Sequence, residues 1–248
     1  MEDTGSRDGA VTFILLSYLR PQNIQRILDA MKASKYCGRI ILSNNRPAIN
    51  ILDYIEPPGD GLEVIQQKEE NLPVNRYSIA RACPGEFFVC IDDDIFLTPQ
   101  QIDTVITALM HDPARPHGVW GEVITMENRT MVVTRGVHNV SREVTILNRV
   151  YAVTRTHVQR FFRFLDDLGV TDPQDLGPVD DIVLSFCGTA PPFCHDVGAL
   201  ENCPTSNQEG IALWKGERFE DQRKEILRRI GALQRKRLKA RQETARRN

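Results

Sequence analysis

The stretch of this 248-residue chain that most restricts its fold is an apolar run that ends in three consecutive aspartates. Residues 87–91 have the aromatic and β-branched composition of a buried strand. Asp92, Asp93 and Asp94 follow directly, and Thr98 then precedes a proline at the first position of a predicted helix. Three adjacent carboxylates repel one another unless a cation or full solvation compensates them. The triplet by itself therefore fits a divalent-cation site at a sheet edge and a solvated acidic turn equally well.

Strands and helices alternate through the first half of the chain. Apolar runs bounded by turn residues predict strands, and apolar residues at helical spacing predict helices between them. The predicted strands are 11–17, 39–43, 62–65 and 87–91, and the predicted helices begin near Ile24 and at Asn75. This order favours an α/β fold with a mostly parallel sheet, right-handed crossovers and flanking helices.

The second half of the chain follows a different pattern. After a helix predicted for 99–111, β-rich segments between short polar turns indicate a small antiparallel section. These segments are 118–124, 131–134 and 144–153, and helices are predicted for 156–168, for 180–186 and from Glu217 onward. The expected fold thus adds a small antiparallel β section and a C-terminal helix to the parallel sheet.

We expect one domain over residues 11–233, with a nucleotide-binding half at 11–112 and an acceptor half at 113–233. Residues 1–10 are polar and predicted to be disordered, and residues 234–248 are predicted to form a basic helical tail. From Arg223 to the end there are 11 Lys/Arg against 2 Asp/Glu, although the whole chain has a net charge of −2. The acidic remainder argues against a nucleic-acid partner. The tail fits a solvated helix, and a peripheral contact with anionic membrane lipid is the alternative.

Cysteine usage and apolar runs bear on where the protein works. No apolar run is long enough to span a bilayer, and no secretory signal is recognised before Val11. The six cysteines form no C-x-x-C pair, which favours reduced surroundings and a cytoplasmic location. A Cys194–Cys203 bridge, a peripheral membrane location and a Golgi or ER lumen stay open as alternatives, as does a homodimer.

Polar residues end three of the predicted strands. Ser17 and Arg20 follow the first strand, Asn44 and Asn45 follow the second, and the aspartate triplet follows the fourth. In a parallel sheet these ends lie along one crevice. Carboxylates for a metal ion, a metal ion for a diphosphate, and amides for a base and ribose together fit a sugar nucleotide. The chain has no G-x-G-x-x-G motif and no P-loop lysine, which argues against a dinucleotide dehydrogenase and a P-loop enzyme.

With these features in this order, the chain resembles the GT-A glycosyltransferases and, among them, is similar to the exostosin-like hexosaminyltransferases. The resemblance extends from about Val11 to about Arg229 and includes the aspartate triplet. Its other parts are Ser17-Tyr18-Leu19-Arg20, Asn44-Asn45, Asn71 with Asn75-Arg76, Asp180-Asp181-Ile182, Gly210 to Trp214, and Gln222-Arg223. The chain departs from the family at Pro178-Val179, where the family often has Asn-Cys.

The resemblance implies a role for each matched position. It implies Asp94 as the ligand of Mn²⁺ or Mg²⁺, with Asp92 and Asp93 holding the ribose and the donor sugar. It also implies that Asp181 lies near the reacting carbon and that Arg223 helps the diphosphate to leave. Without the resemblance, the interpretation favoured for the two later aspartates is that of acidic residues in the first turn of a helix. The further contacts expected with the nucleotide sugar are Ser17, Arg20, Asn44, Asn45, Asn71, Arg76 and Asp180.

The resemblance predicts a metal-dependent enzyme that transfers a sugar, expected to be N-acetylhexosamine, from a UDP-sugar to an acceptor hydroxyl with retention of configuration. The acceptor, whether a glycan, a lipid-linked molecule or a small molecule, stays open. One alternative is an inverting enzyme with Asp181 as base, and another is a non-catalytic module that binds a sugar nucleotide or glycan. A nucleotidyltransferase is disfavoured because residues 17–21 lack its Gly-rich, basic loop.

Overall fold

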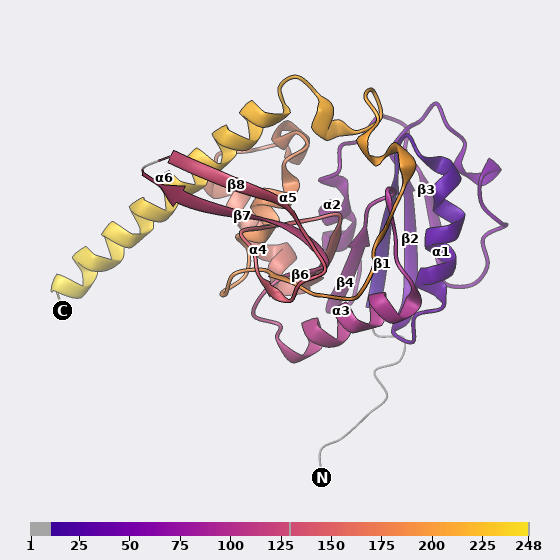
Figure 1. The fold of residues 1–248 in the computed structure, drawn as a ribbon, viewed down its shortest axis with the longest axis horizontal. Helices are drawn as coiled ribbons and strands as arrows, with labels where there is room; N and C mark the ends of the chain where they lie inside the picture. The colour runs from indigo at the N-terminus through magenta and orange to yellow at the C-terminus, as the bar shows by residue number, and fades with distance from the viewer. Residues whose placement is uncertain (1–10, 129, 248) are drawn as a thin grey trace, which may run out of the picture.

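The computed structural model of the chain describes residues 11–128 and 130–247, and an eight-stranded sheet forms its centre. The strand order is β3-β2-β1-β4-β11-β6-β12-β9 (Figure 1). The elements of the first half are β1 (Val11–Ser17), α1 (Ile24–Lys32), β2 (Cys37–Asn44), β3 (Leu62–Gln66), α2 (Asn75–Ala82) and β4 (Phe87–Ile91). Because β1 pairs in parallel with both β2 and β4, and β2 pairs in parallel with β3, the predicted parallel core is confirmed.

The second half adds antiparallel strands and four more helices. The helices are α3 (Pro99–His111), α4 (Arg155–Asp167), α5 (Asp180–Ser185) and α6 (Phe219–Arg247). The strands are β5 (Ile95–Phe96), β6 (His117–Gly118), β7 (Trp120–Glu127), β8 (Thr130–Val137), β9 (Arg142–Glu143), β10 (Ile146–Asn148), β11 (Val150–Thr154), β12 (Phe193–Cys194) and β13 (Glu201–Asn202). The expected α/β class, with a small antiparallel sheet and a C-terminal helix, is confirmed.

The β-rich segment 144–153 is divided between two sheets. Its first part, β10, belongs to the three-stranded antiparallel sheet β10-β7-β8, and its second part, β11, pairs with β4 in the central sheet. Arg149 lies between them with a φ of 64°, a left-handed conformation that is uncommon for a side chain other than glycine. This single residue turns the chain from one sheet to the other.

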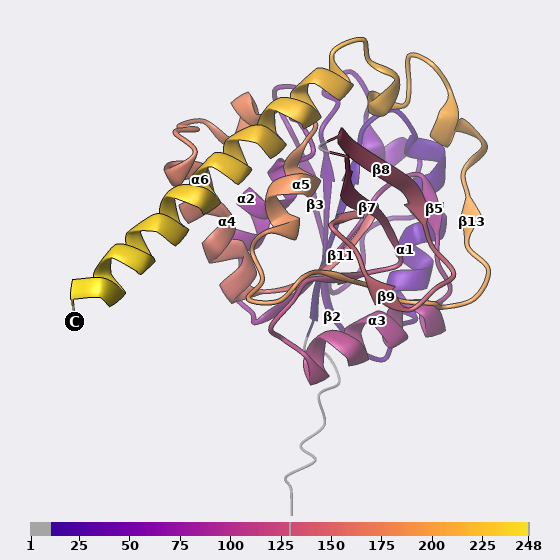
Figure 2. The ribbon, with the colours of Figure 1, turned by 60° about the vertical axis from the view of Figure 1, so that its left-hand side comes forward.

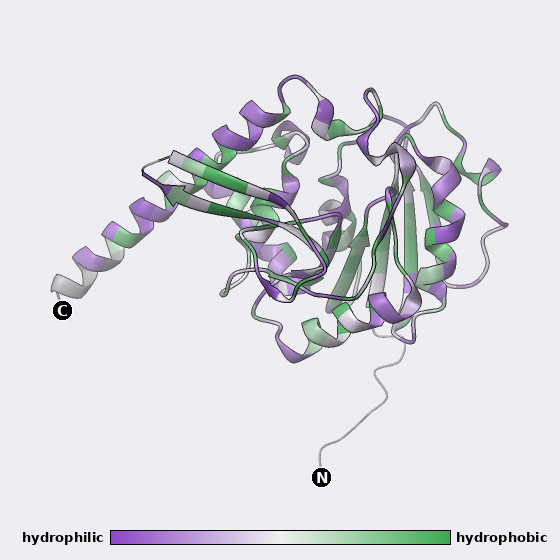
Figure 3. Cartoon of the chain, in the orientation of Figure 1, coloured by the Kyte–Doolittle hydropathy of each residue, from purple (hydrophilic) through white to green (hydrophobic). Residues whose placement is uncertain are grey.

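Apolar side chains fill both spaces between the sheet and its helices. On one face, Phe13 and Leu28 belong to a buried cluster with residues of α3, and on the other, Tyr77 and Phe161 belong to a cluster with residues of α5 and α6. Figure 2 shows α2, α4, α5 and α6 together on this second face, and Figure 3 shows the apolar colouring of the central strands. Burial of each such side chain contributes roughly 1.5–3 kcal/mol, so the core holds the strand ends in fixed positions.

Helix α6 is continuous for 29 residues and passes through the boundary expected at residue 233. Ile226 and Ile230 are buried against the body, whereas the distal part runs out beyond it (Figures 1 and 2). The predicted helical tail is therefore the end of a longer helix, and the division into two halves stays a prediction. The predicted disorder of residues 1–10 lies outside the described residues.

Two further findings concern the expected location. All six cysteines carry free thiols, so the alternative Cys194–Cys203 bridge is absent. In the described part of the chain, no helix combines the length and the apolar character needed to cross a membrane.

Candidate functional site

A cavity of about 440 Å³ lies at the carboxyl ends of β1, β2 and β4, beneath residues from β7, α5 and the start of α6. The predicted site residues that line it are Arg20, Asn45, Asn71, Arg76, Asp92, Asp93, Asp94, Asp180, Asp181 and Arg223. Two predicted residues, Ser17 and Asn44, are not among its described lining residues. Asn44 instead donates its amide hydrogens to the carbonyls of Arg46 and Ile49, which holds the loop after β2.

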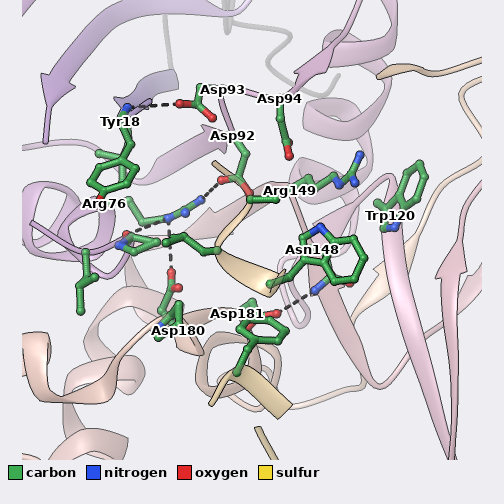
Figure 4. A pocket seen from close by; sticks show the side chains of 18 of the residues that line it. Tyr18, Arg76, Asp92, Asp93, Asp94, Trp120, Asn148, Arg149, Asp180 and Asp181 are labelled. Carbon is green, nitrogen blue, oxygen red and sulfur yellow. Dashed lines mark hydrogen bonds and ion pairs between the residues drawn. The ribbon is translucent and has the colours of Figure 1, made fainter. Parts of the chain in front are cut away.

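The three consecutive aspartates point in three directions (Figure 4). Asp92 accepts a hydrogen bond of 2.5 Å from Arg76, and Asp93 accepts one of 2.8 Å from Arg20 and another from the backbone of Tyr18. Two arginines therefore relieve the repulsion within the triplet. Because Asp93 is buried, the interpretation of the triplet as a solvated acidic turn is wrong.

Asp94 is the member of the triplet with a spare ligand atom. Its Oδ1 is buried without a hydrogen-bond partner, and its Oδ2 lies 3.8 Å from the nearest Arg20 nitrogen. Burial raises the pKa of Asp94 to about 6, against the opposing effect of Arg149. The described residues contain no group of three or more His, Cys, Asp or Glu side chains placed to hold a metal. One carboxylate fits Mg²⁺ or Mn²⁺ when substrate phosphates and water supply the other ligands.

Arg76, near the start of α2, is buried between two carboxylates. It lies 2.5 Å from Asp92 and 3.3 Å from Asp180, and its guanidinium lies over the ring of Tyr151. Burial raises the pKa of Asp180 to about 7, while Arg76 acts to lower it. Burial works to lower the pKa of Arg76, but the two carboxylates raise it well above its ordinary value. This arginine therefore joins the aspartate triplet to the first turn of α5.

A second arginine, Arg223 of α6, joins the opposite side of the cavity. Its guanidinium donates to Asp181 of α5 at 2.8 Å and to Glu122 of β7 at 2.7 Å. Asn148 donates to the same Asp181 oxygen at 2.7 Å. Burial raises the pKa of Glu122, and Arg223 opposes that rise. Asp181 and Arg223, which share no neighbourhood in the sequence, are thus in direct contact.

The sequence reasoning missed the cavity residues that come from the antiparallel section. Trp120, Glu122, Asn148 and Arg149 all line the cavity. The polar pair Asn148-Arg149 interrupts an otherwise apolar β segment, which is a signal that the sequence does contain. Glu122 had no such signal. Its position depends on the close approach of β7 to β10 at the neighbouring Gly121, where a Cβ would lie 2.7 Å from a backbone oxygen of β10.

Two histidines, His117 and His195, contact each other outside the described lining of the cavity. The Nδ1 of His117 lies 2.8 Å from the Nε2 of His195, and the other nitrogen of His117 lies 2.8 Å from the carbonyl of Asp112. Burial lowers the pKa of His117, and it lowers the pKa of His195 to about 4. Both rings are therefore neutral near pH 7.

Comparison with known proteins places the fold. No family model and no curated protein sequence matches the chain. Many solved structures are similar to it, among them three that each have low sequence identity. A CMP:2-keto-3-deoxy-manno-octonic acid synthetase complexed with CTP has a TM-score of 0.52 at 10% identity, over 79% of this chain and 94% of that one.

The second similar structure is GalNAc-T7 with UDP, GalNAc and Mn²⁺, which has a TM-score of 0.51 at 10% identity, over 86% of this chain and 48% of that one. The third is residues 1–349 of TarS from S. aureus, with a TM-score of 0.50 at 13% identity. The match covers 77% of this chain and 59% of that one. The chain thus spans about half the length of the GalNAc-T7 structure. Its own fold is the GT-A-like fold that these structures share.

Proposed function

We propose that the chain transfers a sugar from a UDP-sugar to an acceptor hydroxyl with the help of Mn²⁺ or Mg²⁺. One observation carries the proposal, namely the unpaired, buried Oδ1 of Asp94 in a cavity where Asp181 and Arg223 lie in direct contact. The GT-A-like fold supports a nucleotide-sugar-dependent transferase. N-acetylhexosamine as the transferred group comes from the resemblance to the exostosin-like family, and the acceptor is a glycan, a lipid-linked molecule or a small molecule.

The reaction breaks the bond between the anomeric carbon and the diphosphate oxygen, and that oxygen keeps the electron pair. The acceptor oxygen forms the new bond to the anomeric carbon and gives up its proton. Positive charge develops on the sugar, and negative charge develops on the diphosphate. We propose that Asp181 stabilises the positive carbon and that Arg223 stabilises the departing diphosphate. The 2.8 Å contact between the two side chains supports this assignment, because it brings both to one side of the cavity.

Of the remaining lining residues, some are proposed to contact the substrate and others to position the catalytic and metal-binding side chains. Asn45 and Asn71, which follow β2 and precede α2, are proposed to contact the nucleotide. Arg76 and Asp180 are proposed to fix the positions of Asp92 and of the first turn of α5. A divalent cation bound at Asp94 would supply Lewis-acid stabilisation of the diphosphate.

In the retaining reaction, the acceptor proton passes to an oxygen of the departing diphosphate. The inverting alternative uses Asp181 as the base that takes this proton. NMR of the anomeric proton in the glycoside product separates the two reactions, because its coupling constant reports the configuration of the new bond relative to that of the donor. Retention supports the main proposal, and inversion replaces it with the alternative.

The test is a UDP-release assay with a panel of UDP-sugars, with Mn²⁺, with Mg²⁺ and with EDTA. We expect one donor to be turned over only when a divalent ion is present, and Asp94→Asn to abolish that turnover. Asp221→Asn, which changes an exposed carboxylate of α6, is the matched control and should retain it. Calorimetric binding of UDP without turnover of any donor would overturn the enzyme assignment in favour of a binding module. Turnover that persists in EDTA would overturn the metal requirement.

A further inference from the structure

The arginines of the cavity differ in what they contact. Five arginines line it, and four of them form ion pairs: Arg20 with Asp93, Arg76 with Asp92 and Asp180, Arg135 with Glu220, and Arg223 with Asp181 and Glu122. The fifth, Arg149, has no carboxylate within ion-pair distance among the described residues. Asp94 acts on its charge electrostatically but forms no ion pair with it, so Arg149 is the arginine of the described lining without an ion-pair partner.

The backbone of Arg149 is built into the aspartate loop. Its carbonyl accepts a hydrogen bond of 2.7 Å from the Asp92 backbone, and its own N–H donates to the Tyr151 hydroxyl at 3.0 Å. These bonds support the left-handed conformation, with φ at 64°, in which any side chain other than glycine is strained. Strain of this kind persists only where the surroundings enforce it, as they do at functional sites.

The side chain of Arg149 is oriented by neutral groups. Its guanidinium lies 4.3 Å from the centre of the Trp120 ring, and its Nη1 donates to Oδ1 of Asn202 at 2.5 Å. His138 stacks on the same indole at 4.1 Å, which fixes the ring in turn. An aromatic face and an amide hold the direction of the guanidinium without cancelling its charge. The arginine is therefore set in advance for an anion.

Arg149 lies beside Asp94, and Figure 4 shows the Asp94 carboxyl group directed toward it. From this placement we infer that Arg149 binds the diphosphate of the donor, on the side of the cavity that faces Asp94. The inference rests on the proposed function. A planar guanidinium donates two parallel hydrogen bonds to phosphate oxygens, and that geometry matches the two free oxygens of a phosphate better than a ribose or a base. The ligand class is a nucleoside diphosphate, with the contact on its second phosphate.

The first experiment measures calorimetric affinity for UDP and for UMP, with Mg²⁺, in wild type and in Arg149→Gln. We expect UDP to bind about 10- to 100-fold more weakly to the variant, the range for loss of a charge-assisted hydrogen bond, and UMP to change less than about threefold. Arg142→Gln, an exposed arginine of β9, is the control and should match wild type for both. Equal UDP affinity in Arg149→Gln and wild type would overturn the inference, as would an equal loss for UDP and UMP.

The second experiment tests the orientation of the side chain and protects against a variant that fails to fold. Asn202 is not among the described lining residues, so Asn202→Ala removes the bond to Arg149 without changing the cavity wall. We expect Asn202→Ala to weaken UDP binding about threefold to tenfold, and the double variant with Arg149→Gln to bind no more weakly than Arg149→Gln alone. Additive losses would overturn the orienting role. If wild type binds neither UDP nor any other nucleoside diphosphate, the proposed function itself fails, whereas wild-type binding that ignores Arg149 removes only this inference.

Discussion

On each side of the cavity one arginine joins two carboxylates. We call the side with Arg76, Asp92 and Asp180 the strand edge, and the side with Arg223, Asp181 and Glu122 the roof. The strand-edge carboxylates depend on their arginine more completely. Asp180 has an oxygen with no hydrogen-bond partner of its own, whereas Asp181 also accepts from Asn148 and from a backbone N–H.

This difference separates structure from chemistry. An arginine whose removal leaves a buried carboxylate such as Asp180 without a partner is needed for folding, because a buried unpaired charge destabilises the native state. Around Arg223, Asp181 keeps Asn148 and a backbone N–H as donors, and Glu122 keeps Arg135 at 3.9 Å, so this arginine can be altered while the fold survives. We therefore expect Arg76 at the strand edge to contribute mainly to stability and Arg223 at the roof to contribute mainly to catalysis.

The largest expected effect is the loss of Arg76. Arg76→Ala should lower the free energy of unfolding by about 3–5 kcal/mol at pH 8, and Arg223→Ala by about 1–3 kcal/mol. Denaturant unfolding measures both, with Arg81→Ala, an exposed position of the same helix α2, as the control. A larger loss in Arg223→Ala than in Arg76→Ala would reverse the comparison.

The penalty in Arg76→Ala should also depend on pH. Burial already raises the folded-state pKa of Asp180 to about 7, and removing Arg76 takes away the opposing effect. A carboxyl group whose pKa is raised on folding destabilises the native state increasingly as pH rises from its unfolded pKa of about 4 to its folded-state pKa, and a higher folded-state pKa extends this loss to higher pH. The gap in stability between variant and wild type should therefore narrow between pH 8 and pH 5.5.

The next effect concerns catalysis at the roof. Asp181→Asn keeps the shape of the side chain and an acceptor for Asn148, but removes the negative charge beside Arg223. Turnover of the donor found in the UDP-release assay should fall about 10²- to 10³-fold, with a thermal midpoint within about 2 °C of wild type. Unfolding of this variant, or full turnover in it, would contradict the assignment of catalysis to the roof.

A smaller effect comes from the two histidines outside the cavity lining, which provide a buried contact without fixed charge. Burial keeps the pKa of His195 at about 4 in the folded protein, below its unfolded value of about 6.5. The unfolded chain therefore binds more protons between these values, and stability is lost as pH falls through them. His195→Gln keeps a donor for His117. Between pH 7.5 and pH 5, the midpoint of thermal unfolding should fall by about 2–4 °C less in this variant than in wild type. An equal loss in both proteins would show that this contact does not sense pH.

The smallest expected effect is that of the distal helix. Truncation after Leu233 removes the exposed ion pair between Arg237 and Asp167, and should change stability by about 0–1 kcal/mol with no change in turnover. Co-sedimentation with vesicles that contain anionic lipid tests the separate proposal of a peripheral membrane contact. Loss of vesicle binding on truncation supports that contact, and equal binding by both forms rules it out for this segment.

The strand edge could be predicted from the sequence because local pattern and topology agree there. The segments 11–17 and 87–91 are bounded in the structure as their apolar runs predicted, and parallel pairing then brings the residues after them to one edge. The helix at 99–111 was equally well marked, since Thr98 and Gln101 form the capping box at its start.

The roof could be predicted only in part. Asp181 and Arg223 came from the resemblance, not from any local pattern that would place them in contact. Glu122 and Arg149 depend on the pairing of β7 with β10 and on one left-handed residue between β10 and β11, neither of which has a periodic signature. Non-local strand pairing is decided by the whole packed structure, so a single-sequence pattern does not identify these residues.

Helix α6 connects the cavity to a region beyond the body of the protein. Arg223 lies near its first turn, in the cavity, and the same unbroken 29-residue helix reaches past the body, a rod of roughly 43 Å at about 1.5 Å per residue. Between its two ends the helix is anchored by Ile226 and Ile230, which are buried in the core. A partner that bound the distal end of α6 would therefore act on the cavity through this packing, without entering the cavity.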